Sequence, residues 1–218
     1  MASSLGSSTG AGTVRAPRGA ASPSAADLDP RGSVRLVSEG LETWARQTLA
    51  SVDGLSASRL RHIAGVARRA AAACAALKTD HEGLVVAAAW LHDIGYAPEL
   101  ADTGCHPIDG ARHLRQLDAP DELGGLVAYH SGAENEAAER GLHGELAGYP
   151  RPRHKLLDVL TYADMTTDTN GFHASVESRL RGIHDRYDAN DPVYLAVGGS
   201  RTYLLAAVRR VQDRLPAT

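Results

Sequence analysis

Aromatic side chains are scarce in this chain, making up 5% of its 218 residues. Apolar residues still reach 43%, so alanine and leucine have to supply most of the packing. Such side chains favour closely approaching helices over a β-sandwich, whose core would be rich in Val, Ile and aromatic residues. We therefore expect an all-α fold, with one domain of ordinary size.

Cysteines, long apolar runs and net charge are also low. Two cysteines are too few for a disulfide framework, which favours a reducing, cytoplasmic setting. No stretch approaches the roughly twenty apolar residues of a membrane span. A net charge of −3 creates no field that would draw the protein to nucleic acid or to an anionic membrane. The expected partner is a small molecule, and the sequence carries no signal for an oligomeric state.

The chain divides into two parts by composition. Residues 1–32 are mostly Ala, Ser, Gly, Thr and Pro without periodic apolar positions, which predicts a disordered tail. Residues 33–218 carry apolar positions at helical spacing, which predicts a single helical domain. The expected helices begin near Ser33, at Ser56 or Ser58, before Trp90, at Pro107, after Pro120, at Leu156, near Ala174 and at Tyr203. Between Gly132 and Pro152, a Glu- and Gly-rich segment with weak amphipathicity predicts a mobile connection or lid.

The pair His92-Asp93 follows a nearly continuous apolar run, residues 84–91, which is typical of a buried helix that ends at Gly95. Buried ionisable groups are costly unless they are paired or metal-bound. The pair therefore predicts a metal site. A second pair, His184-Asp185, lies among charged residues and is typical of a solvated helix face.

Four more potential ligands lie at or near the inner ends of other expected helices: His62, His106, His130 and Asp164. Any one of them alone is more often a hydrogen-bonded core residue. Six with the same placement on different helices are hard to explain as coincidence. Four imidazoles and two carboxylates suit Fe, Mn, Zn, Co or Ni better than Ca, and Mg is also compatible. Six side chains are about right for two divalent ions that share an aspartate.

The order His62, His92-Asp93, Asp164 resembles that of the HD-domain superfamily of metal-dependent phosphohydrolases. His106 and His130 resemble the two additional histidines of its binuclear subset, although the short spacing after the His-Asp pair leaves His106 open as a substrate contact. The resemblance covers roughly residues 56–170 and implies an all-α bundle with the metals at its centre.

This resemblance also implies an activity. The expected reaction is hydrolysis of a phosphate ester or anhydride of a small metabolite or nucleotide by metal-activated hydroxide, with His92 and Asp93 as catalytic residues and Asp93 as the bridging ligand. Tyr96 stands where many binuclear relatives carry Lys. The Gly-Tyr-Pro signature of one cyclic-dinucleotide diesterase group is absent, which disfavours that specificity.

A phosphate substrate needs cations, and the candidate substrate-binding residues are Arg112, Arg115 and Lys155, with Arg179 more distant.

Two further acids are candidates for supporting the ligands. Asp168 would share a face with Asp164 if the helix continues, and it either holds a histidine tautomer or is only a surface acid at the helix C-terminus. Asp109 either orients His106 or is a first-turn acid favoured by the helix dipole.

Two other functions remain open at this stage. A mixed-valent di-iron oxygenase could use the same scaffold, and iron with oxygen consumption would identify it. A non-catalytic ligand-sensing or scaffolding module would be favoured if residues 132–152 closed the pocket permanently.

Overall fold

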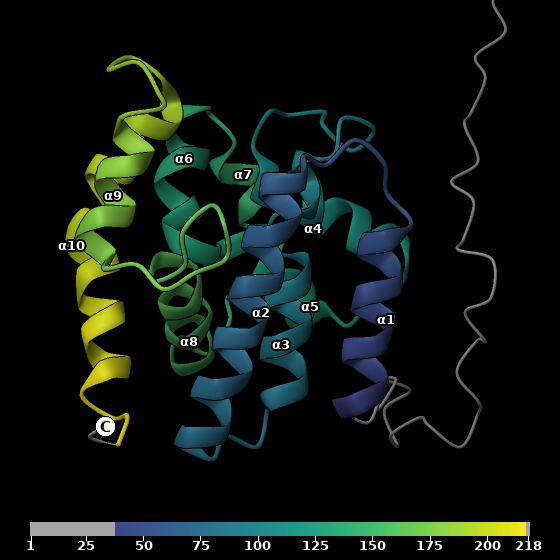
Figure 1. The fold of residues 1–218 in the computed structure, drawn as a ribbon. Helices are drawn as coiled ribbons and strands as arrows, with labels where there is room; N and C mark the ends of the chain where they lie inside the picture. Colours follow the sequence, from purple (N-terminus) through teal and green to yellow (C-terminus); the bar gives the residue numbers. More distant parts are fainter. Residues whose placement is uncertain (1–37, 217–218) are drawn as a thin grey trace, which may run out of the picture.

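The computed structural model describes residues 38–216, in which helices are joined by turns and loops and the β-structure consists of one isolated bridge, between Thr167 and His173 (Figure 1). The all-α expectation is confirmed, while the tail predicted for residues 1–32 lies outside the described part. The α-helices are α1 (Ser38–Ala50), α2 (Ala57–Leu77), α3 (Glu82–Leu91), α4 (His106–Gln116), α5 (Asp121–Tyr129), α6 (Ala133–Glu139), α7 (His143–Leu146), α8 (His154–Met165), α9 (Val176–His184) and α10 (Pro192–Gln212). Two 3₁₀ turns, η2 (Ile94–Tyr96) and η3 (His130–Gly132), follow α3 and α5.

Helix starts follow the local chemistry that the sequence offers. Ser56 caps α2, where its hydroxyl accepts a hydrogen bond from the Arg59 backbone N–H at 3.1 Å. Pro107 stands in the first turn of α4, where a missing N–H costs nothing. Asp191 caps α10 by accepting from the Val193 N–H at 2.8 Å. Helix α10 therefore starts well before the expected Tyr203. The early part was missed because it contains two glycines, which form helix weakly.

The segment between Gly132 and Pro152 is not the irregular connection that its composition predicts. It forms α6 and α7, and α6 packs against α10. Ala137 and Leu146 are buried in the core, which anchors both short helices. The segment therefore serves as a wall of the bundle.

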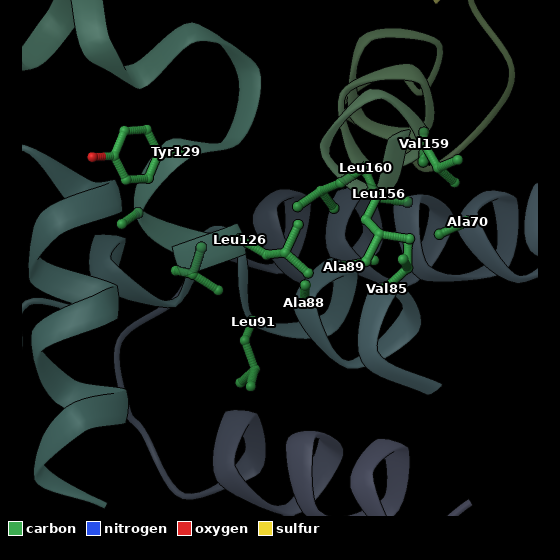
Figure 2. Close-up of a cluster of buried hydrophobic side chains, with 14 of the residues drawn as sticks. Ala70, Val85, Ala88, Ala89, Leu91, Leu126, Tyr129, Leu156, Val159 and Leu160 are labelled. Carbon is green, nitrogen blue, oxygen red and sulfur yellow. The ribbon is translucent and has the colours of Figure 1, made fainter. Parts of the chain in front are cut away.

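Helix α3 is the centre of the bundle and contacts α1, α2, α5 and α8. Its consecutive residues Ala87, Ala88 and Ala89 are fully buried, and these small side chains let neighbouring backbones approach closely. Figure 2 shows Ala88 and Ala89 beside Leu160 of α8 and Leu126 of α5. The C-terminal end of this central helix carries His92 and Asp93 into the interior.

Gly95 has a role other than the helix-ending one that its position suggests. Helix α3 ends at Leu91, and Gly95 lies in η2. A Cβ at Gly95 would lie 2.1 Å from the carbonyl oxygen of His106 and 2.6 Å from the N atom of Gly110. Only glycine therefore lets the first turn of α4 approach the His-Asp pair this closely.

Among residues 38–216, no helix combines the length and apolarity needed to cross a bilayer.

Candidate metal centre

All six predicted ligands converge at one place in the bundle. They come from α2, the turn after α3, the start of α4, the turn after α5 and the last turn of α8: His62, His92, Asp93, His106, His130 and Asp164. Their ligand atoms form two groups, and within each group the atoms lie within 4.8 Å of one another. The deep group is His62, His92 and Asp164, and the pocket group is Asp93, His106 and His130.

The deep group is held rigidly by the backbone. His62 lies with one ring nitrogen, Nδ1, 3.0 Å from the carbonyl oxygen of Asp168 and with Nε2 3.0 Å from Asp164 Oδ1. His92 Nδ1 lies 2.8 Å from the carbonyl oxygen of Ala89. Since each carbonyl accepts a hydrogen bond from Nδ1–H, the Nε2 atoms of both rings face the centre, where they are available as metal ligands.

The pocket group is anchored less completely. His130 Nδ1 donates to the carbonyl oxygen of Val127 at 2.7 Å. His106 Nε2 lies 3.3 Å from His130 Nε2 and 3.4 Å from Asp93 Oδ1. The His106 ring stacks on Tyr96 with 4.0 Å between centroids, and its Nδ1 lies 3.9 Å from Glu136. The His106 ring is therefore held by stacking on Tyr96 and by the close approach at Gly95, whereas each of the other three rings is held by a backbone carbonyl.

Asp93 connects the two groups. Its Oδ2 lies 3.4 Å from His92 Nε2 and 3.9 Å from His62 Nε2, and its Oδ1 faces His106. One carboxylate oxygen thus points to each group. This placement is the one that a ligand shared between two ions requires.

The protonation states fit metal binding. Burial disfavours the Asp93 anion, but His92 and the Arg59 guanidinium hold the pKa of its carboxyl well below the usual range. The pKa of Asp164 is likewise well below its usual value because its contacts with the His62 ring and with the Arg179 guanidinium outweigh burial. These two carboxylates are therefore ionised at neutral pH.

The histidines of the pocket group favour the form that binds metal. Burial lowers the pKa of His106 and of His130, which keeps both imidazoles neutral.

His92, in the deep group, behaves differently. Burial also disfavours its protonation, but the neighbouring Asp93 carboxylate raises its pKa overall. His92 Nε2 is buried and makes no hydrogen bond within the described part of the chain. Because a buried polar atom normally has a partner, this nitrogen fits a metal ion.

Two arginines and a serine contact the carboxylates of the site. The sequence named Arg179 as a more distant candidate cation and did not connect Arg59 or Ser131 with the site. Arg59 NH1 lies 2.5 Å from Asp93 Oδ2, and Arg179 NH2 lies 3.3 Å from Asp164 Oδ1. The Ser131 hydroxyl donates to Asp164 Oδ2 at 2.5 Å. A sequence signal existed for Arg59, which precedes His62 by three positions and so shares its helix face.

A pocket opens onto this centre. Its inner end includes Asp93, His106, His130 and Asp164. Its other walls come from Glu136 on α6 and from side chains of α9 and α10. A small molecule in this pocket would lie directly against the ligands.

The three candidate substrate cations lie elsewhere. Arg112 pairs with Asp102 and Glu145 at the surface. Arg115 stacks on Tyr149 and donates to the carbonyl oxygen of Gly148 at 2.8 Å. None of these arginines lines the pocket, and neither does the exposed Lys155 near the start of α8. The cations that line it are Arg59, Arg179 and Arg186.

Asp168 and Asp109, the two acids expected to support the ligands, make contacts other than the expected ones. Helix α8 ends at Met165, so Asp168 does not continue its face, and its backbone carbonyl contacts His62. The Asp168 carboxylate accepts hydrogen bonds from the N–H groups of Asn170 and Phe172. Asp109 is buried and accepts from the Thr103 N–H and hydroxyl at 3.0 and 2.8 Å, which fixes the loop before α4.

His184 belongs to neither ligand group and packs its ring against Tyr194, at 4.4 Å between centroids.

Comparison with known proteins gives one match. Residues 59–167 match the family model described as the HD domain, close to the range 56–170 expected from the ligand pattern. No curated protein and no solved structure matches the chain. The matched range begins at Arg59 and includes all six candidate ligands.

Proposed function

The chain belongs to the HD-domain family, whose members are mostly metal-dependent phosphohydrolases, and we propose that it hydrolyses a phosphate ester or anhydride of a small molecule at a binuclear centre. The observation that carries this proposal is the position of Asp93, with one oxygen toward the deep group and one toward the pocket group. A site with one shared carboxylate and an adjoining pocket suits in-line displacement at phosphorus.

The deep group and the pocket group would each hold one divalent cation. Such cations lower the pKa of water and neutralise charge on a phosphoryl group. Fe, Mn, Zn, Co and Ni fit the mixture of imidazole and carboxylate best.

The chain itself supplies orientation and charge. Backbone carbonyls fix the tautomers of His62, His92 and His130. The guanidinium groups of Arg59 and Arg179 face the same pocket as the ligands and can hold phosphoryl oxygens. Their charges would stabilise negative charge that accumulates on the phosphoryl group as the bond to the leaving group breaks.

The decisive experiment combines elemental analysis with phosphate release from a panel of phosphate mono- and diesters, after metal removal and reconstitution. We expect about two ions per chain and metal-dependent release of phosphate. Asp93→Ala should lose both the metal and the activity while far-UV circular dichroism retains its helical signal.

His184→Ala is the matched control, because His184 lies outside both groups, and it should retain metal and activity. An active, metal-replete Asp93→Ala protein would contradict the site. Mixed-valent iron with oxygen consumption and no phosphate release would contradict the hydrolytic function in favour of an oxygenase.

A further inference from the structure

Three arginine side chains meet at the wall of the pocket. They come from α2, from α9 and from the turn after α9: Arg59, Arg179 and Arg186. The same three line a neighbouring opening together with Ser58 and Thr169. The arginines therefore stand at the junction of two openings, one of which leads to the ligands. Figure 1 shows α2 and α9 on either side of the connection that follows α8.

Most of their hydrogen-bonding capacity is unused. A guanidinium has five N–H donors. Arg59 donates a hydrogen bond from NH1 to Asp93, and NH2 of Arg179 contacts Asp164 and His62. The Nε of Arg179 is buried and has no hydrogen-bond partner in the part of the chain that the structure describes. Arg186 makes no side-chain hydrogen bond or ion pair with any described residue.

Like charges at this junction repel one another. Partial removal from water, with the nearby charges of Arg179 and Arg59, lowers the pKa of the Arg186 guanidinium. The two carboxylates that face these arginines, Asp93 and Asp164, belong to the candidate ligand set. An anion with more than one negative charge would relieve the repulsion and use the free donors.

The wall contributed by α10 is mainly apolar, and the hydroxyl of its Ser200 is already engaged, since it accepts from Asn135 and donates to the Gly132 carbonyl. Val193 and Val197 are partly buried and Ala196 is buried, and all three line the pocket. Glu136, the lining acid outside the ligand set, pairs with Arg140 at 2.9 Å. This wall offers contact area for an apolar group and no free carboxylate for the hydroxyls of a sugar.

We propose that the substrate is a phosphate monoester of a compact, mainly apolar alcohol, with its doubly charged phosphoryl group on the three arginines and its alcohol against α10. This inference rests on the proposed hydrolytic function. In the reaction the oxygen of water bonds to phosphorus, the bond from phosphorus to the alcohol oxygen breaks, and a proton from water passes to that oxygen. The products are the alcohol and inorganic phosphate.

The test measures binding of three non-hydrolysable probes to the metal-loaded full chain by calorimetry. Phenylphosphonate carries two charges, its methyl ester carries one, and methylphosphonate keeps the charge but lacks the ring. We expect phenylphosphonate to bind about 10-fold more tightly than its methyl ester, because charge-assisted hydrogen bonds are lost in the ester. It should also bind at least about 10-fold more tightly than methylphosphonate because its ring is buried against α10.

Arg186→Gln should remove most of the preference for the doubly charged probe, whereas Arg181→Gln, at an exposed arginine of α9 outside the pocket lining, should retain it. Equal binding of the probe and its methyl ester, or equal effects of the two substitutions, would overturn the role of the arginines. Equal binding of phenylphosphonate and methylphosphonate would overturn the role of α10, and no binding of any probe would overturn both. These affinities do not depend on turnover, so they are distinct from a failure of the chain to release phosphate.

Discussion

The two ligand groups are built differently although Asp93 joins them. In the deep group, both histidines are nearly inaccessible, with 0% of His92 and 2% of His62 exposed, and backbone carbonyls fix both rings. In the pocket group, the His106 side chain is 14% exposed and relies on Tyr96 and on the close approach at Gly95. The difference teaches that one half of the centre is part of the core, whereas the other half depends on how α4 docks.

The strongest test of this comparison removes one histidine from each group. His62→Ala should eliminate binding at the deep group and reduce activity by more than about 100-fold, beyond the cost of losing a supporting hydrogen bond alone. His106→Ala should leave the deep group occupied, with about one ion per chain. Elemental analysis and phosphate release on both variants would measure the contrast.

Circular dichroism provides the control for these variants, since both should retain the helical signal. If His106→Ala lost all of its metal while His62→Ala kept one ion, the assignment of the more robust group would be reversed.

A smaller effect is expected when the docking of α4 is disturbed. Gly95→Ala would place a methyl group against the His106 carbonyl, so α4 must shift, at a cost of about 1–3 kcal/mol in the free energy of unfolding. Urea unfolding would measure this loss, and metal titration should show weaker binding mainly at the pocket group.

Gly40→Ala is the matched control, because a Cβ there meets nothing within 4 Å and Gly40 lies within α1. This substitution should stabilise the protein by about 0.5–1 kcal/mol, since alanine suits a helix better than glycine. Equal destabilisation by both substitutions would show that α4 docking is not special.

The smallest effect concerns the ring beneath His106. Tyr96 lies between the His106 ring and the Arg59 guanidinium, which is 3.9 Å above its centroid. Tyr96→Ala removes both stacking contacts, each worth roughly 1 kcal/mol, and should weaken metal binding at the pocket group about 10-fold.

Tyr96→Phe keeps the ring and should bind metal within about 3-fold of the wild type, since the aromatic face is retained. The deep group should be unchanged in either variant. A loss of affinity in Tyr96→Phe equal to that in Tyr96→Ala would assign the effect to the hydroxyl and exclude the stack.

The convergence of the six candidate ligands could be predicted from the sequence because they stand at or near the ends of expected helices, where a buried ionisable side chain needs a partner. The cations that line the pocket could not all be identified in this way, and of the three the sequence named only Arg179, as a more distant candidate. Lys155 precedes Asp164 by nine positions on α8, so the two lie about 13 Å apart along the helix axis. Arg186 reaches the pocket only because of how α9 packs, and the local sequence around it does not predict that packing.

Helix α6 shows a second limit of sequence reasoning. Its small and acidic residues give little amphipathic signal, yet Ala133 and Ala137 pack into the bundle and bring Glu136 to the pocket. Tertiary contacts from α10 supply the stability that local propensity lacks.

The guanidinium groups beside the two ligand carboxylates also bear on the order in which this protein is assembled. Arg59 and Arg179 carry a positive charge to Asp93 and Asp164 within the chain itself. Burial of the two acids is thereby compensated without an external cation, unlike in small zinc domains that unfold when the metal is removed. The polypeptide can therefore complete its folding after synthesis before any metal ion is bound.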